Sequence, residues 1–213
     1  MVTGVFGSKF AFSEMLTRAT PLIFTGLAAA LAFRAKLWNI GAEGQLYLGA
    51  IAAVAIGTGV FDVSGLILIP TIIVFGCVAG AFGMIVPATL KIRYGADEVV
   101  TTLLLNFIII ILLQYMLEGP LKDPMGLGWP QSSPVLDQGM LPKVMERMRI
   151  HYGFAIALLC AAFAQFMLIR SVWGFKLRAV GENMHAARHA GLPVNRSLLT
   201  VAAISGALAG LAG

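Results

Sequence analysis

Charged residues are scarce in this sequence. Only 12% of its 213 residues are Asp, Glu, Lys or Arg, whereas 59% are hydrophobic. Soluble domains carry about a quarter charged residues, so this composition excludes an ordinary soluble protein and indicates an integral membrane protein. Because the apolar stretches are continuous rather than alternating, they predict spanning helices and not the strands of a barrel. The fold class that we expect is all-α, as a polytopic membrane protein formed by one domain over residues 1–213.

Groups that carry chemistry in enzymes are also missing. The two cysteines, Cys77 and Cys160, lie inside apolar stretches and are interpreted as small packing residues. The sequence has no phosphate-binding loop, no nucleophile elbow and no paired catalytic groups. His185 and His189 are four residues apart, but a third ligand and the HExxH glutamate are lacking, so we predict no metal site. We expect no enzyme, no cofactor and no nucleic-acid partner, and any energy source must be a separate protein.

The apolar stretches give the expected spans. Three of them approach the roughly 20 residues that cross a hydrocarbon core. These full spans are Leu66–Leu90, Val99–Leu117 and Tyr152–Ile169. Two shorter runs, Thr20–Phe33 (with a helix that could begin near Phe10) and Leu46–Val60, flank a polar, Gly-containing segment at Arg34–Gln45. This arrangement predicts a broken or re-entrant helix, and a last helix is expected from Leu198 onward.

Basic residues set the expected orientation, because Lys and Arg in short loops mark the cytoplasmic side. They occur in three loops: Arg34 and Lys36; Lys91 and Arg93; and Arg170, Lys176, Arg178, Arg188 and Arg196. Alternation of the spans places all three loops on one face, which we expect to be cytoplasmic. The turn Phe61–Gly65 and the long loop 119–151 then face outward, although that loop also holds Lys143, Arg147 and Arg149.

Residues 173–195 form a polar, charged insert between two apolar stretches. A bilayer does not require such a segment between two spans, whereas a surface that docks onto a soluble protein does. We therefore interpret the insert as a docking loop with short-helix character on the cytoplasmic face.

Polar residues near membrane depth are the candidates for a solute path. Those of the first polar segment are Asn39, Glu43 and Gln45. A charge at the bilayer centre costs about 2.5–3.5 kcal/mol on insertion scales, so these residues should line a cavity or lie at the interface. Gly41 and Gly44 permit backbone geometry that bulkier residues resist. Two interpretations stay open: a helix break beside a solute path, or a connecting turn in which Glu43 pairs with Lys36 or Arg34.

The span that begins after Gly95 adds two more candidates. Asp97 and Glu98 lie in its first turn, where carboxylates gain about 0.3–1 kcal/mol from the helix dipole, and capping is sufficient to explain both. Thr102 and Asn106 are four residues apart and share a face. An amide inside a span needs a partner, either another helix or a ligand. Both roles stay open, and Asn106 is the first choice for a solute path.

Small residues predict close helix packing. Gly76 and Gly80 are four residues apart, as are Gly206 and Gly210 in an Ala-rich context. Such faces let membrane helices approach closely. The alternative is that the spacing has no specific meaning, because Gly and Ala are common in any membrane helix.

Three segments carry a recognisable pattern: Asn39–Gln45, Gly95–Asn106 and Phe175–Gly191. Together they resemble the permease subunits of bacterial ABC importers in the branched-chain amino acid, ribose and simple-sugar group. Residues 119–131 are similar to the nucleoside-type permeases of that group. The motifs occur in the same order and cover nearly the whole chain.

The resemblance implies a multi-pass permease of the bacterial cytoplasmic (inner) membrane that forms the pathway for a nucleoside or simple-sugar-like solute. Its implied partners are an ATP-binding subunit, of the tandem type, which uses the ATP; a second permease, as homo- or heterodimer; an outer substrate-binding lipoprotein; and membrane lipid. The implied coupling helix maps to Gly181–Gly191, with contacts at Gly181, Glu182, Asn183, Arg188 and Gly191. Such permeases have further spans at both ends, so we expect this chain to be truncated.

Other classes remain as alternatives. An ATP-independent secondary transporter or channel would need ion-coupling groups at the midplane, and the expected full spans contain no Asp, Glu or His there. An intramembrane enzyme is disfavoured by the missing catalytic groups, and a pure scaffold would bind the ATPase without transport. The absence of a fixed charge in the full spans favours a neutral solute.

Overall fold

The computed structural model describes residues 9–58, 64–143 and 149–213, and it is built from helices. In chain order these are α2 (Lys9–Arg34), α3 (Ala42–Gly57), α4 (Gly65–Tyr94), α5 (Glu98–Glu118), η1 (Asp137–Gly139), α6 (Tyr152–Arg170), α7 (Val172–Glu182), α8 (Met184–His189) and α9 (Val194–Ala212). Five of the described helices, α2, α4, α5, α6 and α9, are long and apolar enough to cross a membrane. The prediction of an all-α polytopic membrane protein is confirmed.

Some predicted features extend beyond the described residues. The end of the second short apolar run, most of the expected turn at residues 61–65, and Arg147 in the long loop fall in this category. The last helix begins at Val194, one turn before the expected Leu198, so Arg196 belongs to its first turn.

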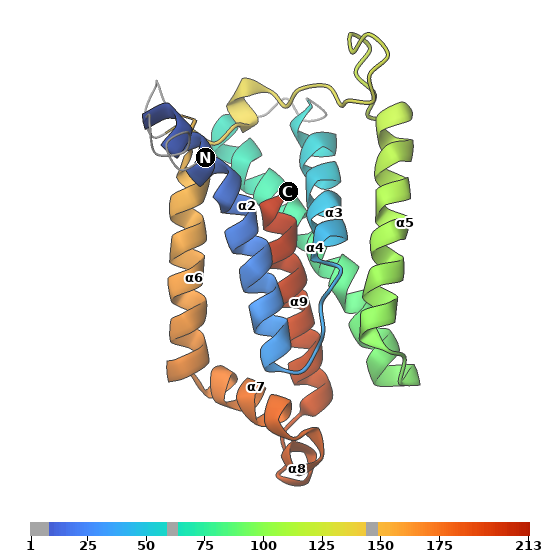
Figure 1. Ribbon diagram of the computed structural model, residues 1–213, viewed down its shortest axis with the longest axis vertical. Helices are drawn as coiled ribbons and strands as arrows, with labels where there is room; N and C mark the ends of the chain where they lie inside the picture. Colours follow the sequence, from blue (N-terminus) through green and yellow to red (C-terminus); the bar gives the residue numbers. More distant parts are fainter. Residues whose placement is uncertain (1–8, 59–63, 144–148) are drawn as a thin grey trace.

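The second crossing of the bundle, residues 35–57, begins without helical structure, and we call it the broken span. α2 ends at Arg34, residues 35–41 are not helical, and the chain then continues into α3 (Figure 1). α3 has 16 residues. At 1.5 Å per residue it is about 24 Å long, too short to cross a hydrocarbon core of about 30 Å alone. Figure 1 shows the start of α3 well above the lower end of α2, with α3 running on to the opposite end. The chain is therefore interrupted at the predicted polar segment. α2 is by itself long enough to cross a membrane, so the two apolar runs are not the halves of one broken helix; the second crossing begins with the non-helical residues 35–41 and continues as α3.

Glycines bring α4 and α9 together in the centre of the bundle. A Cβ atom added at Gly80 or at Gly206 would lie closer than 3.0 Å to the carbonyl oxygen of the other residue. A Cβ atom added at Gly210 would lie equally close to the carbonyl oxygen of Gly76. The two predicted small-residue pairs therefore face each other. Backbones that approach this closely gain dispersion contacts and need no polar bond to associate.

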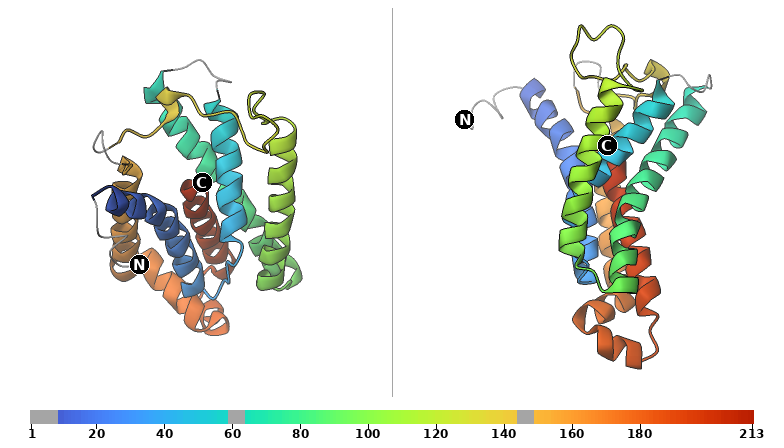
Figure 2. Two further views of the ribbon diagram at one scale, coloured as in Figure 1. Left: turned by 45° about the horizontal axis from the view of Figure 1, so that its top comes forward. Right: turned by 90° about the vertical axis from the view of Figure 1, so that its right-hand side faces the viewer.

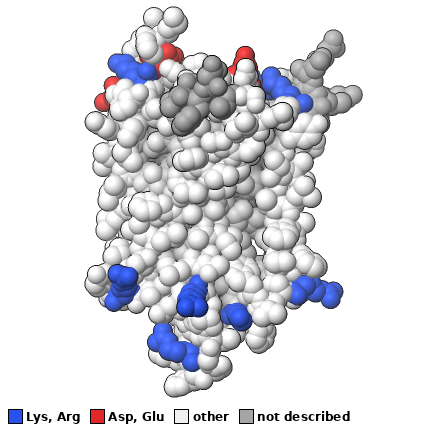
Figure 3. All heavy atoms as spheres, turned by 180° about the vertical axis from the view of Figure 1, so that it is seen from behind, with Lys and Arg blue, Asp and Glu red and all other residues white. Residues whose placement is uncertain are grey.

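The two ends of the molecule differ. The α2–α3, α4–α5 and α6–α9 connections all lie at the end that carries α7 and α8 (Figures 1 and 2). Figure 3 shows Lys and Arg side chains gathered at this end, which we call the basic end, whereas both signs of charge occur at the opposite end. The three basic loops that we expected on one face of the membrane therefore lie at the same end of the molecule.

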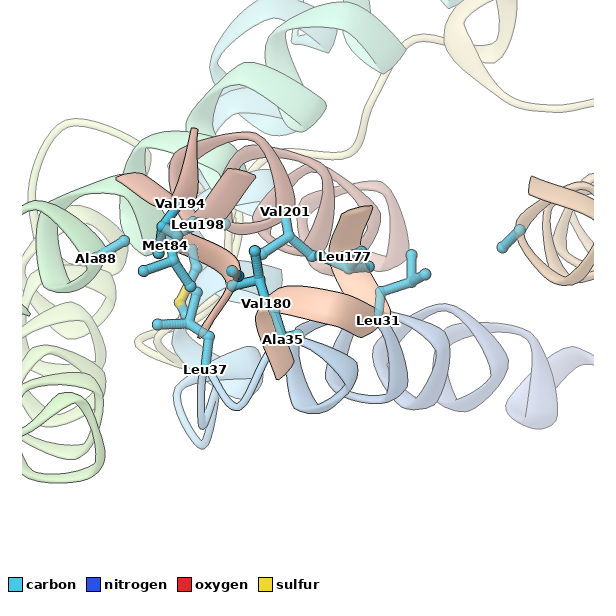
Figure 4. Close-up of a cluster of buried hydrophobic side chains, with 14 residues drawn as sticks. Leu31, Ala35, Leu37, Met84, Ala88, Leu177, Val180, Val194, Leu198 and Val201 are labelled. Carbon is cyan, nitrogen blue, oxygen red and sulfur yellow. The ribbon is translucent and has the colours of Figure 1, made fainter. Parts of the chain in front are cut away.

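A buried apolar cluster fixes α7 to the spans at the basic end (Figure 4). Leu177 and Val180 of α7 are almost fully buried, and the cluster also contains Leu31 of α2 and Val201 of α9. Burying a side chain of this size contributes about 1.5–3 kcal/mol. α7 is therefore an integral part of the packed bundle.

Candidate functional site

The five path candidates lie on the broken span and on α5, which packs against α3. Glu43 is exposed, whereas the other four, Asn39, Gln45, Thr102 and Asn106, are buried. They form two groups. One group faces α9, and the other lies along the contact between α3 and α5, which we call the α3–α5 seam (Glu43, Gly44 and Tyr47 with Thr102 and Asn106).

The group that faces α9 consists of Asn39 and Gln45, whose side-chain amides are hydrogen-bonded within the protein. The amides of Asn39 and Gln45 bond reciprocally: the Asn39 Nδ2 donates to Gln45 Oε1 at 2.9 Å, and the Gln45 Nε2 donates to Asn39 Oδ1 at 2.8 Å. The Asn39 Nδ2 also donates to the Ser205 hydroxyl at 2.9 Å, which in turn donates to the Ala28 carbonyl. Both amides are only 2% exposed. A buried polar network of this kind ties the non-helical stretch to α9 and α2.

The α3–α5 seam carries a carboxylate with polar neighbours. The Tyr47 hydroxyl donates to Glu43 Oε1 at 3.1 Å, and the Asn106 Nδ2 lies 3.5 Å from Glu43 Oε2. The Asn106 Oδ1 accepts from the Gly44 backbone N–H. The alternative in which Glu43 pairs with Lys36 or Arg34 is not seen, because no ion pair among the described residues involves Glu43. The amide of Asn106 finds its partners on the broken span.

Two glycines let α5 approach the broken span. A Cβ atom at Gly41 would lie 2.8 Å from the Thr102 carbonyl oxygen, and one at Gly44 would lie 2.5 Å from Asn106 Oδ1. Gly41 has φ −87°, which any residue can adopt. The expectation that these glycines supply unusual backbone geometry is therefore replaced by a steric reason. A side chain at either position would push α5 away.

The start of α5 has both a cap and an ion pair. Asp97 accepts from the backbone N–H groups of Val99 and Val100, which confirms its predicted capping role. Glu98 differs: it is buried and accepts from the Lys91 ammonium at 2.5 Å. Capping alone does not explain Glu98. The Thr102 hydroxyl donates to the Glu98 carbonyl at 2.7 Å, so it is satisfied within its own helix.

The broken span also contacts the end of α7. The Lys36 ammonium lies 3.4 Å from the Glu182 carbonyl oxygen. A Cβ atom at Gly181 would lie closer than 3.0 Å to the Arg34 carbonyl, so α7 packs directly against the C-terminal end of α2. Gly181 is thus buried at a helix contact and is not part of the exposed surface.

The tip of the basic end is formed by the last turn of α7 and by α8 (Figures 1 and 2). Glu182, Asn183 and Arg188 are exposed there. The Asn183 side chain accepts from the N–H groups of His185 and Ala186 and so caps α8. Gly191 has φ +78°, a left-handed conformation that favours glycine and turns the chain back toward α9. Glu182 and Arg188 form no ion pair in the part of the chain that the structure describes.

Residues 11–213 match the family described as branched-chain amino acid transport system / permease component. The chain belongs to this permease family. No solved structure matches it.

Three of the similar proteins are named as permeases of ABC transporters. The guanosine ABC transporter permease protein NupP of Bacillus subtilis is 39% identical over 211 residues, which cover 99% of this chain and 60% of that protein. The glucose ABC transporter permease protein TsgB13 of Haloferax volcanii is 36% identical, with coverages of 97% and 56%. The nucleoside ABC transporter permease protein NupB of Lactococcus lactis is 28% identical, with coverages of 97% and 59%. The chain spans about three-fifths of the length of these relatives.

Several residues with contacts at the candidate site were not found from the sequence. Tyr47 lies four residues after Glu43, a helical spacing that could have indicated the contact. Ser205 is next to a predicted packing glycine, but its partner Asn39 lies 166 positions away. Lys91 and Glu98 lie on either side of the short loop between α4 and α5, and their opposite charges could have indicated the ion pair.

Residues 9–58, 64–143 and 149–213 contain no group of three or more His, Cys, Asp or Glu that could hold a metal ion. His185 and His189 are both exposed on α8. They belong to the surface at the tip of the basic end.

Proposed function

We propose that this chain is the transmembrane permease subunit of an ATP-driven ABC importer in a bacterial cytoplasmic membrane, and that it forms the pathway for a nucleoside or a related sugar-containing solute. The observation that carries the proposal is its similarity, over nearly its whole length, to permeases named for guanosine, glucose and nucleosides. Five helices suited to crossing a membrane support it.

The basic end is proposed to face the cytoplasm and to dock onto the ATP-binding subunit through α7 and α8. The support is the position of α8 at the tip and the exposed charges of Glu182 and Arg188, which form no ion pair with another described residue. Basic loops on this end agree with the charge rule for cytoplasmic loops. The opposite end, with residues 119–151, is proposed to face the substrate-binding lipoprotein. A second permease subunit, identical or different, completes the pathway.

The α3–α5 seam is proposed to line this pathway. Glu43 lies near the start of α3, inside the thickness of the bundle, and a carboxylate exposed to lipid at that depth is costly. A water-filled path or a subunit interface removes that cost. We propose Glu43 as the residue that faces the path, and the buried Asn106 as the residue that holds the Glu43 carboxylate in place. Asn39, Gln45 and Thr102 are proposed to hold the broken span in place, because their polar groups are buried and satisfied by the protein.

An ATP-independent transporter is the second candidate, and Glu43 is the observation that favours it. A carboxylate at intramembrane depth is the kind of group that couples transport to protons or cations. The two candidates differ in their energy source, which an experiment can separate.

The test is uptake of radiolabelled guanosine into proteoliposomes that contain the chain together with its ATP-binding subunit, second permease and binding protein. We expect uptake that requires ATP inside the vesicles, stops with a non-hydrolysable ATP analogue, and continues when ionophores collapse the ion gradients. Uptake that needs an ion gradient and ignores ATP would establish the second candidate instead.

A further inference from the structure

Glu43 lies between the two ends of the bundle and is exposed. It is the second residue of α3, whose start lies between the two ends of the bundle in Figure 1. Its neighbour Asn106 lies eight residues after Glu98, the first residue of α5, and therefore about 12 Å along the axis of that helix. Glu43 is exposed in the chain, whereas Asn106 is only 9% exposed. The carboxylate is thus more exposed than the amide beside it.

The carboxylate is held in position but is not saturated. Its two contacts are the Tyr47 hydroxyl at 3.1 Å and the Asn106 amide at 3.5 Å, one on each oxygen. An ionised carboxylate offers about four acceptor sites and no donor. Among the described residues no Lys or Arg forms an ion pair with it. The described residues therefore leave acceptor sites of the carboxylate free on its exposed side.

This arrangement selects solutes by the hydrogen bonds that they donate. Two oxygens of one carboxylate can accept from two neighbouring hydroxyl groups, as a bidentate pair. Nucleosides and sugars both carry adjacent ring hydroxyls that can donate in this way. We infer that the Glu43 carboxylate recognises the neighbouring hydroxyls of the solute on its way through the membrane, with Tyr47 and Asn106 as positioning residues. This inference rests on the proposed function.

The experiment compares ATP-dependent uptake of guanosine with that of 2′,3′-dideoxyguanosine in the complete reconstituted importer. The same binding protein serves every variant, so a change in the ratio of the two uptake rates reports on the permease. We expect Glu43→Gln to lower the guanosine preference by roughly tenfold or more, because a donor amide replaces an acceptor oxygen. Glu43→Asp keeps the charge and should fall between the parent and Glu43→Gln.

The control is Glu118→Gln, which removes an exposed carboxylate at the far end of α5 and should leave the ratio unchanged. Co-purification of each variant with the ATP-binding subunit verifies assembly. If the parent takes up neither compound in an ATP-dependent way, the proposed function is wrong and the inference falls with it. If the parent transports guanosine and neither Glu43→Gln nor Glu43→Asp changes the ratio, the inference alone is overturned.

Discussion

The ammonium of Lys91 donates to the backbone carbonyl of Lys36 at 3.3 Å and so joins α4 to the stretch between α2 and α3. The same ammonium pairs with Glu98 at the start of α5. The side chain of Lys36 in turn reaches the Glu182 carbonyl at the end of α7. Lys36 has φ +51°, an uncommon conformation for a non-glycine residue. The end of α7, the broken span and α5 are therefore linked by three consecutive contacts.

Under the proposed function, these contacts predict that Lys36 couples the proposed docking end, α7 and α8, to the proposed path along the α3–α5 seam. Lys36→Met keeps the aliphatic stem but removes the donor to Glu182, so movement of α7 would reach the broken span less directly. In the reconstituted importer we expect ATP hydrolysis to stay within about twofold of the parent while uptake falls by roughly fivefold or more, as expected for the loss of one charge-assisted hydrogen bond.

The matched control for Lys36 is Arg93→Met, which removes an exposed cation at the same end of the molecule. It should change neither rate appreciably. Equal losses of hydrolysis and uptake in Lys36→Met would show a docking or folding defect and would contradict a coupling role.

The Lys91–Glu98 pair is expected to contribute to stability. Glu98 is buried, and Glu98→Gln leaves the partly buried ammonium without its charged partner. We expect a loss of about 1–3 kcal/mol, smaller than for a fully buried pair because Lys91 retains some contact with solvent. Thermal unfolding in mild detergent measures the change.

A double-mutant cycle with Lys91→Met tests whether this loss belongs to the pair. The double variant should be less destabilised than the sum of the two single variants. Strict additivity would show that the two residues do not stabilise each other.

Much of this fold could be predicted because membrane helices follow local rules. Apolar length gave the spans, and the polar segment between two short runs predicted the break before α3. The glycine spacing indicated faces for close packing, but it did not indicate that Gly80 would meet Gly206. That pairing depends on how α9 crosses α4, which no local pattern specifies.

The candidate site was less predictable for the same reason. The polar residues of the broken span were identified from their cost in lipid, yet their partners are distant in the chain. Asn39 donates a hydrogen bond to Ser205 and is buried, whereas Glu43 stays exposed. Both residues have the same sequence signal, a polar group beside a short apolar run. Only the packing of α5 and α9 determines that Asn39 is buried in the structure and that Glu43 stays exposed.

Close packing of α4 and α9 predicts a strong effect of one added methyl group. In Gly206→Ala the new Cβ atom would lie closer than 3.0 Å to the Gly80 carbonyl, so the helices must separate. We expect a loss of about 1–3 kcal/mol, typical of overpacking. The control is Gly26→Ala in α2, where an added Cβ meets nothing within 4 Å. It should be neutral, or stabilising by up to about 1 kcal/mol, because Ala favours a helix. Equal thermal midpoints for the two variants would contradict the packing argument.

The tip of the basic end predicts where charge reversal abolishes docking. Glu182 and Arg188 are exposed and unpaired among the described residues, so reversing both leaves the fold intact while it places like charges against a complementary partner. Like-charge contacts across an interface cost several kcal/mol. We expect the Glu182→Lys, Arg188→Glu variant to lose co-purification with the ATP-binding subunit in mild detergent.

The matched control reverses one acid and one base at the opposite end, with Glu118→Lys and Lys122→Glu, both exposed. This variant has the same net charge as the parent and as the docking variant, so a general effect of altered charge would appear in both. Retention of the ATP-binding subunit by the control and its loss from the tip variant would place the motor contact on α7 and α8. If both variants retain it, docking does not depend on these charges, and the exposed apolar surface of Phe175 on α7 becomes the next contact to test.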